Sequence, residues 1–257
     1  MFDLWTPTVL KIYRALDGQM RLVGGCVRDF LLNKKPDDVD MATPLCPNEI
    51  VKKLSACGIK SSPISLRHGL LEIFSDGEIF EITTLRRDSY NQGRQIVTFI
   101  TDYEQDSARR DFTINALSMD QEKIYDYWKG EEDLKSHRVR FIGDSEERIF
   151  EDPLRIFRYI RFWAAFGGEK PDAAVLGLFP KYRDKLVQSS LNRRKKEFSK
   201  ILMGSRVLEA LNLMRENALF PYVVRQDGVS ELQKLLTVNP NASYEERLLC
   251  FNNYIQN

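Results

Sequence analysis

The spacing of apolar and polar positions changes along the chain, and this change predicts two kinds of architecture. Up to residue 130, short apolar runs and alternating segments predict strands joined by helices. After residue 144, helical spacing predominates. We therefore predict an α+β part followed by an all-helical part. The first 20 residues show near-helical spacing of apolar side chains at Leu10, Ile12, Tyr13 and Leu16.

Turn signals divide the first part of the chain into elements. A helix is predicted over residues 48–57, because Pro47 suits its first turn. Two apolar runs, residues 64–74 and 78–85, are predicted to be strands separated by a tight turn at Asp76-Gly77.

The polar residues 86–94 contain one glycine and show no periodicity, so we predict a mobile loop there. A strand is expected over residues 95–100 and a hairpin over residues 119–128. Between them, a helix is expected to bury three side chains against the sheet: Phe112, Ala116 and Met119.

Composition limits the kind of protein that this chain can be. At 257 residues, with 43% hydrophobic and 29% charged residues, it can bury one large or two small cores. It has no apolar run of about 18 residues and no basic-then-apolar leader, so we expect no membrane span and a cytoplasmic location. Four cysteines without a CxxC pair and two scattered histidines argue against a zinc site.

The first candidate site follows the short apolar run Leu22-Val23. Gly24 and Gly25 come directly after it, and paired glycines between a strand and a helix allow the backbone to approach a ligand. Arg28 adds a cation in the first turn of the predicted helix. Unpaired helix amides together with a guanidinium group favour phosphate as the ligand.

Two carboxylates follow this predicted helix. In the sequence Asp38-Val39-Asp40-Met41, period-two alternation places Asp38 and Asp40 on one face of a predicted strand. Two neighbouring carboxylates repel each other unless a cation lies between them, and oxygen ligands beside phosphate suit Mg²⁺. The alternative is an exposed edge strand with a solvated acidic face.

Two more charged segments are candidates for ligand binding. On the helix expected near residue 112, polar side chains can reach a ribose hydroxyl or a triphosphate, or can form a solvated arginine pair instead. The members of this group are Arg109, Arg110, Asp111 and Asn115. In the helical part, a charged stripe recurs at every third position, and its alternative reading is the solvated face of an amphipathic helix. The members of this stripe are Asp152, Arg155, Arg158 and Arg161.

Together these segments resemble the class II nucleotidyltransferases of the polymerase-β superfamily, a branch that contains CCA-adding enzymes and bacterial poly(A) polymerases. The matching segments are Gly24-Gly25-x-Val27-Arg28-Asp29, Asp38-x-Asp40, RRDFxxNA from Arg109, Asp126-x-x-x-Gly130, EDxxRxxR from Glu151, and Arg193-x-x-x-Glu197. The resemblance implies a polymerase-β-like head, a small mixed sheet with helices, over residues 1–130. A helical neck with a nucleotide-reading motif would cover residues 131–205, and a short helical body would cover residues 206–257.

The resemblance also implies an activity, the template-independent addition of CCA to the 3′ end of tRNA from CTP and ATP, with Mg²⁺ held by Asp38 and Asp40. The nucleotide would contact the glycine turn, Arg28 and the polar group near residue 112 in the head, and the charged stripe from Asp152 in the helical part. No membrane and no protein partner is required. The alternatives are a poly(A) polymerase and a catalytically silent RNA-binding adaptor. The Arg67-His68-Gly69 segment and the strand around Glu81 favour the CCA-adding branch, and an adaptor has no reason to keep two crowded carboxylates.

Base-edge chemistry explains how an aspartate and an arginine can select a nucleotide. Cytosine and adenine each present an amino donor beside a ring acceptor, so Asp152 accepting and Arg155 donating satisfy either base. Uracil and guanine present the opposite pattern, which leaves buried polar groups unpaired at about 1–3 kcal/mol each. Such a pair admits CTP and ATP and refuses UTP and GTP.

The remaining signals concern the helical part. Residues 181–200 carry eight basic and two acidic side chains, which predicts a surface for a phosphate backbone. Within this run, Arg193 and Glu197 are four positions apart and are predicted to pair along one helix. Later apolar positions are expected to pack between helices: Leu208, Leu211, Met214, Leu219, Leu235 and Leu249.

Overall fold

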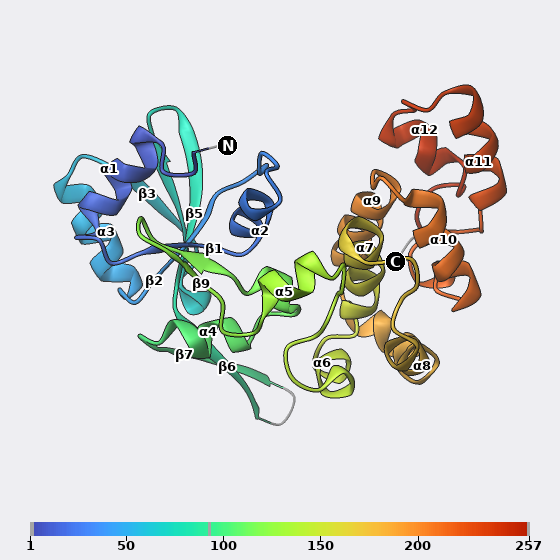
Figure 1. The fold of residues 1–257 in the computed structure, drawn as a ribbon, viewed down its shortest axis with the longest axis horizontal. Helices are drawn as coiled ribbons and strands as arrows, with labels where there is room; N and C mark the ends of the chain where they lie inside the picture. The colour runs from blue at the N-terminus through green and yellow to red at the C-terminus, as the bar shows by residue number, and fades with distance from the viewer. Residues whose placement is uncertain (1–2, 92–93, 256–257) are drawn as a thin grey trace. The chain divides into compact units, whose positions relative to one another are not determined.

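The structure, a computed structural model, describes residues 3–91 and 94–255. It divides into two compact units, Met1–Asp133 and Leu134–Asn257, which we call the head unit and the helical unit (Figure 1). Each unit has its own buried core and is described by itself. Among the described residues, no helix is both long and apolar enough to cross a membrane.

The head unit is built on one mixed sheet, which has seven strands within the described residues, in the order β3-β4-β5-β2-β1-β8-β9. β2 and β5 pair in parallel, and the other neighbours pair antiparallel. The strands are β1 (Arg21–Val23), β2 (Asp40–Thr43), β3 (Lys60–Ser65), β4 (Leu70–Ser75), β5 (Glu78–Thr84), β8 (Ser118–Met119) and β9 (Ile124–Tyr125). The tight turn predicted at Asp76-Gly77 is confirmed, since Ser75 pairs with Glu78 across it.

The helices of the head begin at recognisable caps. In α1 (Pro7–Ala15), the side chain of Thr6 accepts the Val9 N–H. In α3 (Pro47–Ala56), Glu49 closes a capping box, which confirms the helix predicted there. The other helices of this unit are α2 (Gly25–Leu31), α4 (Tyr103–Ala108) and the start of α5 (Gly130–Lys135).

One predicted strand is interrupted. Residues 64–74 do not form a single strand, because a 3-10 turn, Leu66–His68, separates β3 from β4. Gly69 ends this turn with φ +68°, and a Cβ there would lie 2.8 Å from the Cβ of Thr84. Only glycine tolerates both the left-handed backbone and this close approach.

The prediction of a loop over residues 86–94 is also wrong for most of that segment. Its first six residues form β6 (Arg86–Asn91), which pairs antiparallel with β7 (Arg94–Phe99) in a separate two-stranded sheet (Figure 1). Residues 92 and 93 lie outside the described part of the chain. A ribbon that pairs with no other strand has little reason to alternate apolar and polar residues, so periodicity did not reveal it.

The helix predicted near residue 112 is absent from the described structure, where α4 ends at Ala108 and a short 3-10 turn, Thr113–Asn115, precedes β8. Asp111 explains the difference, because its carboxylate accepts the Phe112 N–H at 2.8 Å and the Asn115 side-chain amide at 3.1 Å. Such local bonds compete with a helix. Phe112, Ala116 and Met119 are nevertheless buried, as predicted.

The helical unit is built from helices, as predicted, and its described residues include the isolated bridge of Val224 with Tyr254. Its α-helices after α5 are α6 (Ser145–Glu151), α7 (Arg155–Phe166), α8 (Ala173–Tyr182), α9 (Leu191–Leu202), α10 (Val207–Glu216), α11 (Val229–Val238) and α12 (Tyr244–Leu249). α7 packs against α9 and α10.

Aromatic side chains fill much of this unit's core. Phe198 makes edge-on contacts with Phe220 and Phe251, at ring-centroid distances of 6.5 and 5.4 Å. Among the leucines and methionines predicted to pack, Leu211, Met214 and Leu219 are buried. Leu249 is 64% exposed, so that prediction is wrong.

Gly130 provides a test of packing in the head. A Cβ at Gly130 would overlap the carbonyl oxygen of Thr113 and lie 3.0 Å from its carbon, whereas Gly177 in α8 has no atom within 4 Å. We expect Gly130→Ala to lower the free energy of unfolding of the head by about 1–3 kcal/mol. The control Gly177→Ala should stabilise the helical unit by up to about 1 kcal/mol. Urea unfolding measures both, and equal stability of Gly130→Ala and the wild type would contradict the packing described here.

Candidate functional site

The turn after β1 is shaped by one glycine. Gly24 has φ +76°, and its N–H donates to the Leu117 carbonyl at 2.8 Å. A Cβ on Gly24 would lie 2.7 Å from a terminal nitrogen of Arg110, so a side chain here would displace that guanidinium group. Gly25 has more space, because the nearest atom to its Cβ position belongs to Arg28 at 3.7 Å. The structure therefore requires glycine at position 24 and not at position 25.

Arg28 is held in place behind this turn. Its side chain is 9% exposed, and its guanidinium group donates to the Asn115 side-chain oxygen at 2.6 Å and to both carboxylate oxygens of Asp29, at 2.9 and 3.1 Å. Asn115 in turn donates to Asp111 at 3.1 Å. The chain of bonds from Asp29 to Asp111 fixes the direction of the Arg28 charge, which is a requirement for selective phosphate binding.

A buried carboxylate holds the neighbouring arginines. Asp106 is 3% exposed, accepts Nε of Arg109 at 2.9 Å and lies 3.8 Å from a terminal nitrogen of Arg110. It also accepts the backbone N–H of Arg86, the first residue of β6, at 2.9 Å. Burial lowers the pKa of Arg110, and the charges of Asp106 and Asp40 oppose this change. One carboxylate therefore joins the base of the β6–β7 ribbon to both arginines.

The two predicted metal ligands lie at the start of β2. Asp40 is the first residue of the strand and is exposed, while Asp38 precedes the strand and is also exposed. The prediction that both lie on one strand is therefore wrong for Asp38. Asp40 pairs in register with Glu81 of β5, so a third exposed carboxylate lies beside it on the sheet. Burial, and secondarily the Asp40 charge, raise the pKa of the Cys26 thiol to about 12.

These carboxylates suit a cation that takes its remaining ligands from a bound phosphate and from water. Within the described residues, no group of three or more His, Cys, Asp or Glu side chains is arranged to hold a metal ion. A preformed all-protein cage is therefore absent from the described part of the chain. Mg²⁺ in nucleotide sites uses one or two carboxylates and takes its other ligands from phosphate and water. The exposed, oxygen-only pair of Asp38 and Asp40 meets that requirement.

The helical unit contains the other predicted cluster. Asp152 lies between α6 and α7, where its carboxylate accepts the Leu154 N–H at 3.2 Å, so Pro153 precedes the helix and does not form its first turn. Arg155 begins α7 and donates to the Arg148 carbonyl at 2.7 Å and to Glu151 at 2.8 Å. The Arg155 side chain is therefore anchored on α6, whereas the Asp152 side chain contacts Leu154 and Arg193, and both side chains are partly exposed.

The predicted pair of Arg193 and Glu197 does not form. Glu197, which is 6% exposed, instead accepts a hydrogen bond from Arg158 at 3.0 Å and forms an ion pair with Arg161 at a nitrogen–oxygen distance of 2.9 Å, both on α7. Arg193 pairs with Asp152 at 2.6 Å. Both residues of α9 therefore reach across to the α6–α7 segment, because tertiary partners were closer than the neighbour along the helix.

The basic run over residues 181–200 is partly structural. Lys181 forms an ion pair with Glu146. Arg183 donates to the Asn217 carbonyl at 3.1 Å, and the buried Arg194 donates to the carbonyls of Ser189 and Tyr222. Arg194 is therefore buried and does not belong to an exposed basic surface, while phosphate binding by the rest of the run stays a prediction.

Sequence reasoning did not identify Asp106. The signal that could have found it is its spacing, three and four positions before Arg109 and Arg110, at which carboxylates and arginines pair on a helix. Asp133 was also missed. It is fully buried and accepts the Thr113 hydroxyl at 2.6 Å.

Comparisons with known proteins agree with this geometry. Residues 20–140 match the family described as the poly(A) polymerase head domain. The CCA-adding enzyme of Oceanobacillus iheyensis is 36% identical over 239 residues, which cover 89% of this chain and 58% of that enzyme. The mitochondrial CCA tRNA nucleotidyltransferase 1 of Homo sapiens is 37% identical over 229 residues, 87% of this chain and 52% of that protein. The chain thus spans little more than half the length of these relatives.

A solved structure extends the likeness to the helices. The Bacillus stearothermophilus CCA-adding enzyme in complex with CTP matches with a TM-score of 0.77 and 29% identity, covering 95% of this chain and 59% of that one. The fold is therefore a nucleotidyltransferase head followed by a helical unit, as predicted. Residues 20–140 match the poly(A) polymerase head domain, and most of the chain is similar in sequence and fold to CCA-adding enzymes.

The contacts of Asp106 lead to a prediction for stability. Asp106→Asn keeps the shape of the side chain but removes the charge that compensates two arginines. We expect the free energy of unfolding of the head to fall by about 3–5 kcal/mol, the usual cost of leaving a buried charge without its partner. Urea unfolding measures this loss, and Asp37→Asn, at an exposed position, is the matched control. A loss no larger than that of the control would show that Asp106 does not hold the arginines.

Proposed function

We propose that this chain adds C, C and A to the 3′ end of tRNA, without a template, from CTP and ATP. The observation that carries the proposal is the cluster in the head. There the Gly24 turn meets the guanidinium group of Arg110, and the exposed carboxylate of Asp40 is close enough to influence the pKa of Arg110. The relatives named as CCA-adding enzymes support the same reaction. The cytoplasmic location, the neck over residues 131–205 and the body over residues 206–257 belong to this proposal.

The head residues supply binding and orientation. Arg28 and Arg110 would bind the triphosphate, with their directions fixed by Asn115 and Asp106. Asp38 and Asp40 would hold Mg²⁺, which when bound lowers the pKa of the RNA 3′ hydroxyl and neutralises triphosphate charge. The reaction joins that hydroxyl oxygen to the α-phosphate and releases pyrophosphate.

The helical unit would select the base. The side chains of Asp152 and Arg155 are 24% and 13% exposed, so a base between them would be partly withdrawn from water. Asp152 would accept from the amino group of cytosine or adenine, and Arg155 would donate to the ring nitrogen. Each carboxylate oxygen has a second lone pair, so Asp152 can accept this bond while it keeps those to Leu154 and Arg193.

The reaction is tested by offering a tRNA that lacks its 3′ CCA each nucleotide alone and then all together, and by sequencing the product. We expect C, C and A in that order, with UTP and GTP refused. Repeated addition of A to an arbitrary RNA from ATP alone would identify a poly(A) polymerase. RNA binding without any addition would identify a silent adaptor.

The metal ligands can be tested separately from RNA binding. Asp38→Ala and Asp40→Ala should each reduce nucleotide incorporation by more than about 100-fold, because losing a ligand costs more than the 10- to 100-fold of losing an outer partner. The affinity for tRNA should stay near wild type in both. Glu78→Gln, an exposed carboxylate of the same sheet, is the control. Near-wild-type turnover in either alanine variant would exclude the assignment.

Base selection gives a second prediction. Asp152→Ala removes the acceptor that rejects uracil and guanine, so the preference for CTP over UTP should fall by about 10- to 100-fold, the equivalent of about 1–3 kcal/mol. Competition between labelled CTP and UTP at one tRNA end measures this ratio. Glu147→Ala on α6 is the control. Full selectivity in Asp152→Ala would show that another group reads the base.

A further inference from the structure

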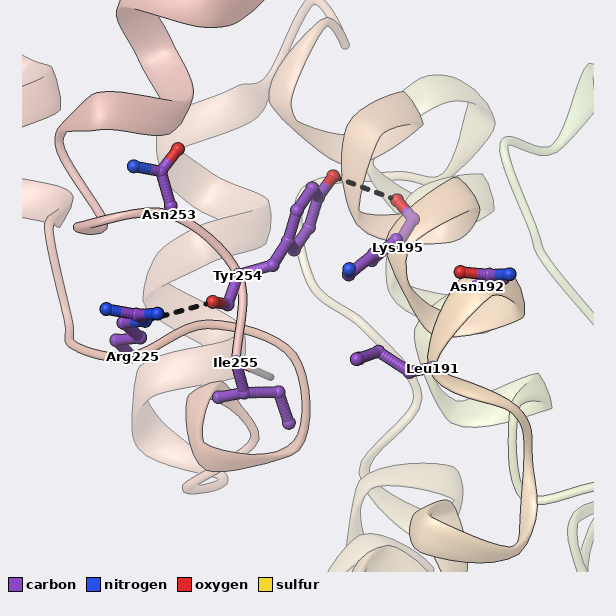
Figure 2. A pocket seen from close by; sticks show the side chains of 7 residues that line it. All are labelled: Leu191, Asn192, Lys195, Arg225, Asn253, Tyr254 and Ile255. Carbon is purple, nitrogen blue, oxygen red and sulfur yellow. Dashed lines mark hydrogen bonds between the residues drawn. The ribbon is translucent and has the colours of Figure 1, made fainter. Parts of the chain in front are cut away.

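The helical unit contains a hollow whose lining residues are not among those of the candidate site described above. Its volume is about 500 Å³, within the range of sites for small ligands. Three separate stretches of chain form it, the beginning of α9 and the segments around residues 225 and 253 (Figure 2). The lining residues are Leu191, Asn192, Lys195, Arg225, Asn253, Tyr254 and Ile255.

The charge of this hollow has one sign. Lys195 and Arg225 are its ionised lining residues, and no carboxylate lines it among the residues that the structure describes. Within the same described part of the chain, neither cation forms an ion pair. Lys195 lies 5.0 Å from the centre of the Tyr254 ring, and that ring leaves the ammonium group charged. Two cations without a counter-charge are an attractive site for an anion.

Hydrogen bonds hold the Arg225 guanidinium group and the backbone at Lys195 in position. Nε of Arg225 donates to the Tyr254 carbonyl at 3.2 Å, and the Arg225 N–H donates to the Asn253 carbonyl at 3.2 Å. The Tyr254 hydroxyl donates to the Lys195 carbonyl at 3.2 Å, as Figure 2 shows. The three stretches of chain are therefore fastened to one another through Tyr254. A site of this kind binds a ligand at a lower entropic cost than one formed by free surface lysines.

The other lining residues suit a nucleotide. Asn192 and Asn253 carry amide groups that both donate and accept hydrogen bonds, as sugar hydroxyls and base edges require. Leu191 and Ile255 add apolar surface against which a ribose or a base can pack. A free phosphate ion would need neither feature, so the hollow is better matched to a phosphate that carries a nucleoside.

We propose that this hollow binds one phosphodiester group of an RNA together with its adjoining nucleotide. A phosphodiester carries a single negative charge, which two cations can neutralise. A free nucleoside triphosphate carries several charges and Mg²⁺, and no carboxylate lines the hollow, within the described residues, to bind that metal. The identification of the RNA as tRNA rests on the proposed function. The proposed binding of a phosphodiester group does not depend on it.

The test compares charge-removing variants by the salt dependence of RNA binding. Binding of a tRNA transcript without its 3′ CCA is measured at several salt concentrations and without nucleotide. We expect Lys195→Gln with Arg225→Gln to weaken binding and to lower the slope of log affinity against log salt by about 1, the effect of one lost phosphate contact. Lys195→Gln alone should also lower this slope. This single exchange leaves the hydrogen bonds of Arg225 intact.

The matched control removes the same charge elsewhere on the helical unit. Lys170 and Lys234 are exposed and lie outside the hollow, so Lys170→Gln with Lys234→Gln should keep the wild-type slope. The exchange Lys195→Arg, which keeps the charge, should also keep it. Equal slope changes in the test and control pairs would overturn the proposal, because net charge alone would then explain them.

Two further experiments distinguish an RNA phosphodiester from a free nucleotide as the ligand, and this site from the proposed function. CTP and ATP are titrated without RNA, and loss of their binding in the Lys195 and Arg225 variants, with an unchanged RNA slope, would identify a free nucleotide as the ligand and overturn the proposal. Nucleotide addition is then measured at saturating tRNA. A wild type that adds nothing but shows the variant-specific slope change would refute the proposed function and support this site. Normal addition with an unchanged slope would refute this site alone.

Discussion

Two guanidinium groups of the head, the buried one of Arg28 and the partly buried one of Arg110, set the conditions that the surrounding structure must satisfy. A charge taken out of water is costly unless hydrogen bonds and opposite charges compensate for it. Arg28 is compensated by Asp29 and Asn115, and Arg110 by Asp106 and the carbonyl of Asn115. The irregular path from α4 to β8 is the consequence, since a regular helix there would direct these partners elsewhere. The same contacts therefore decide the local fold of the head and the positions of its candidate phosphate-binding side chains.

The helical unit uses the same principle with the charges reversed. Glu197 is a buried carboxylate, and two arginines one helical turn apart on α7 surround it. This arrangement ties α9 to α7, because separation of the two helices would leave the buried carboxylate without a partner. Arg158 and Arg161 thus have a structural role that a stripe of exposed charges would not have, whichever ligand the unit binds.

The sequence predicted the features that depend on neighbouring residues and failed where distant ones decide. The Asp76-Gly77 turn and the helix after Pro47 follow from local backbone preferences, and both are present. The pair Arg193 and Glu197 also followed a local rule, yet that rule is worth only about 0.2–0.5 kcal/mol. Contacts with α7 and Asp152 therefore override it. Likewise, the β6–β7 ribbon depends on pairing between strands, and polar composition alone resembled a loop.

The contact between Arg193 and Asp152 bears on how a base could enter. Their side chains are 55% and 24% exposed, so solvent screens the pair, and exposed ion pairs are worth about 0–1 kcal/mol. A buried base edge left without a partner costs about 1–3 kcal/mol, which is the larger quantity. A base that offers an amino group can therefore displace or share Arg193 at little cost, whereas a base that offers a carbonyl oxygen gains nothing from Asp152. In the free protein Arg193 orients the Asp152 carboxylate, and under the proposed function an entering amino group would replace or share this contact.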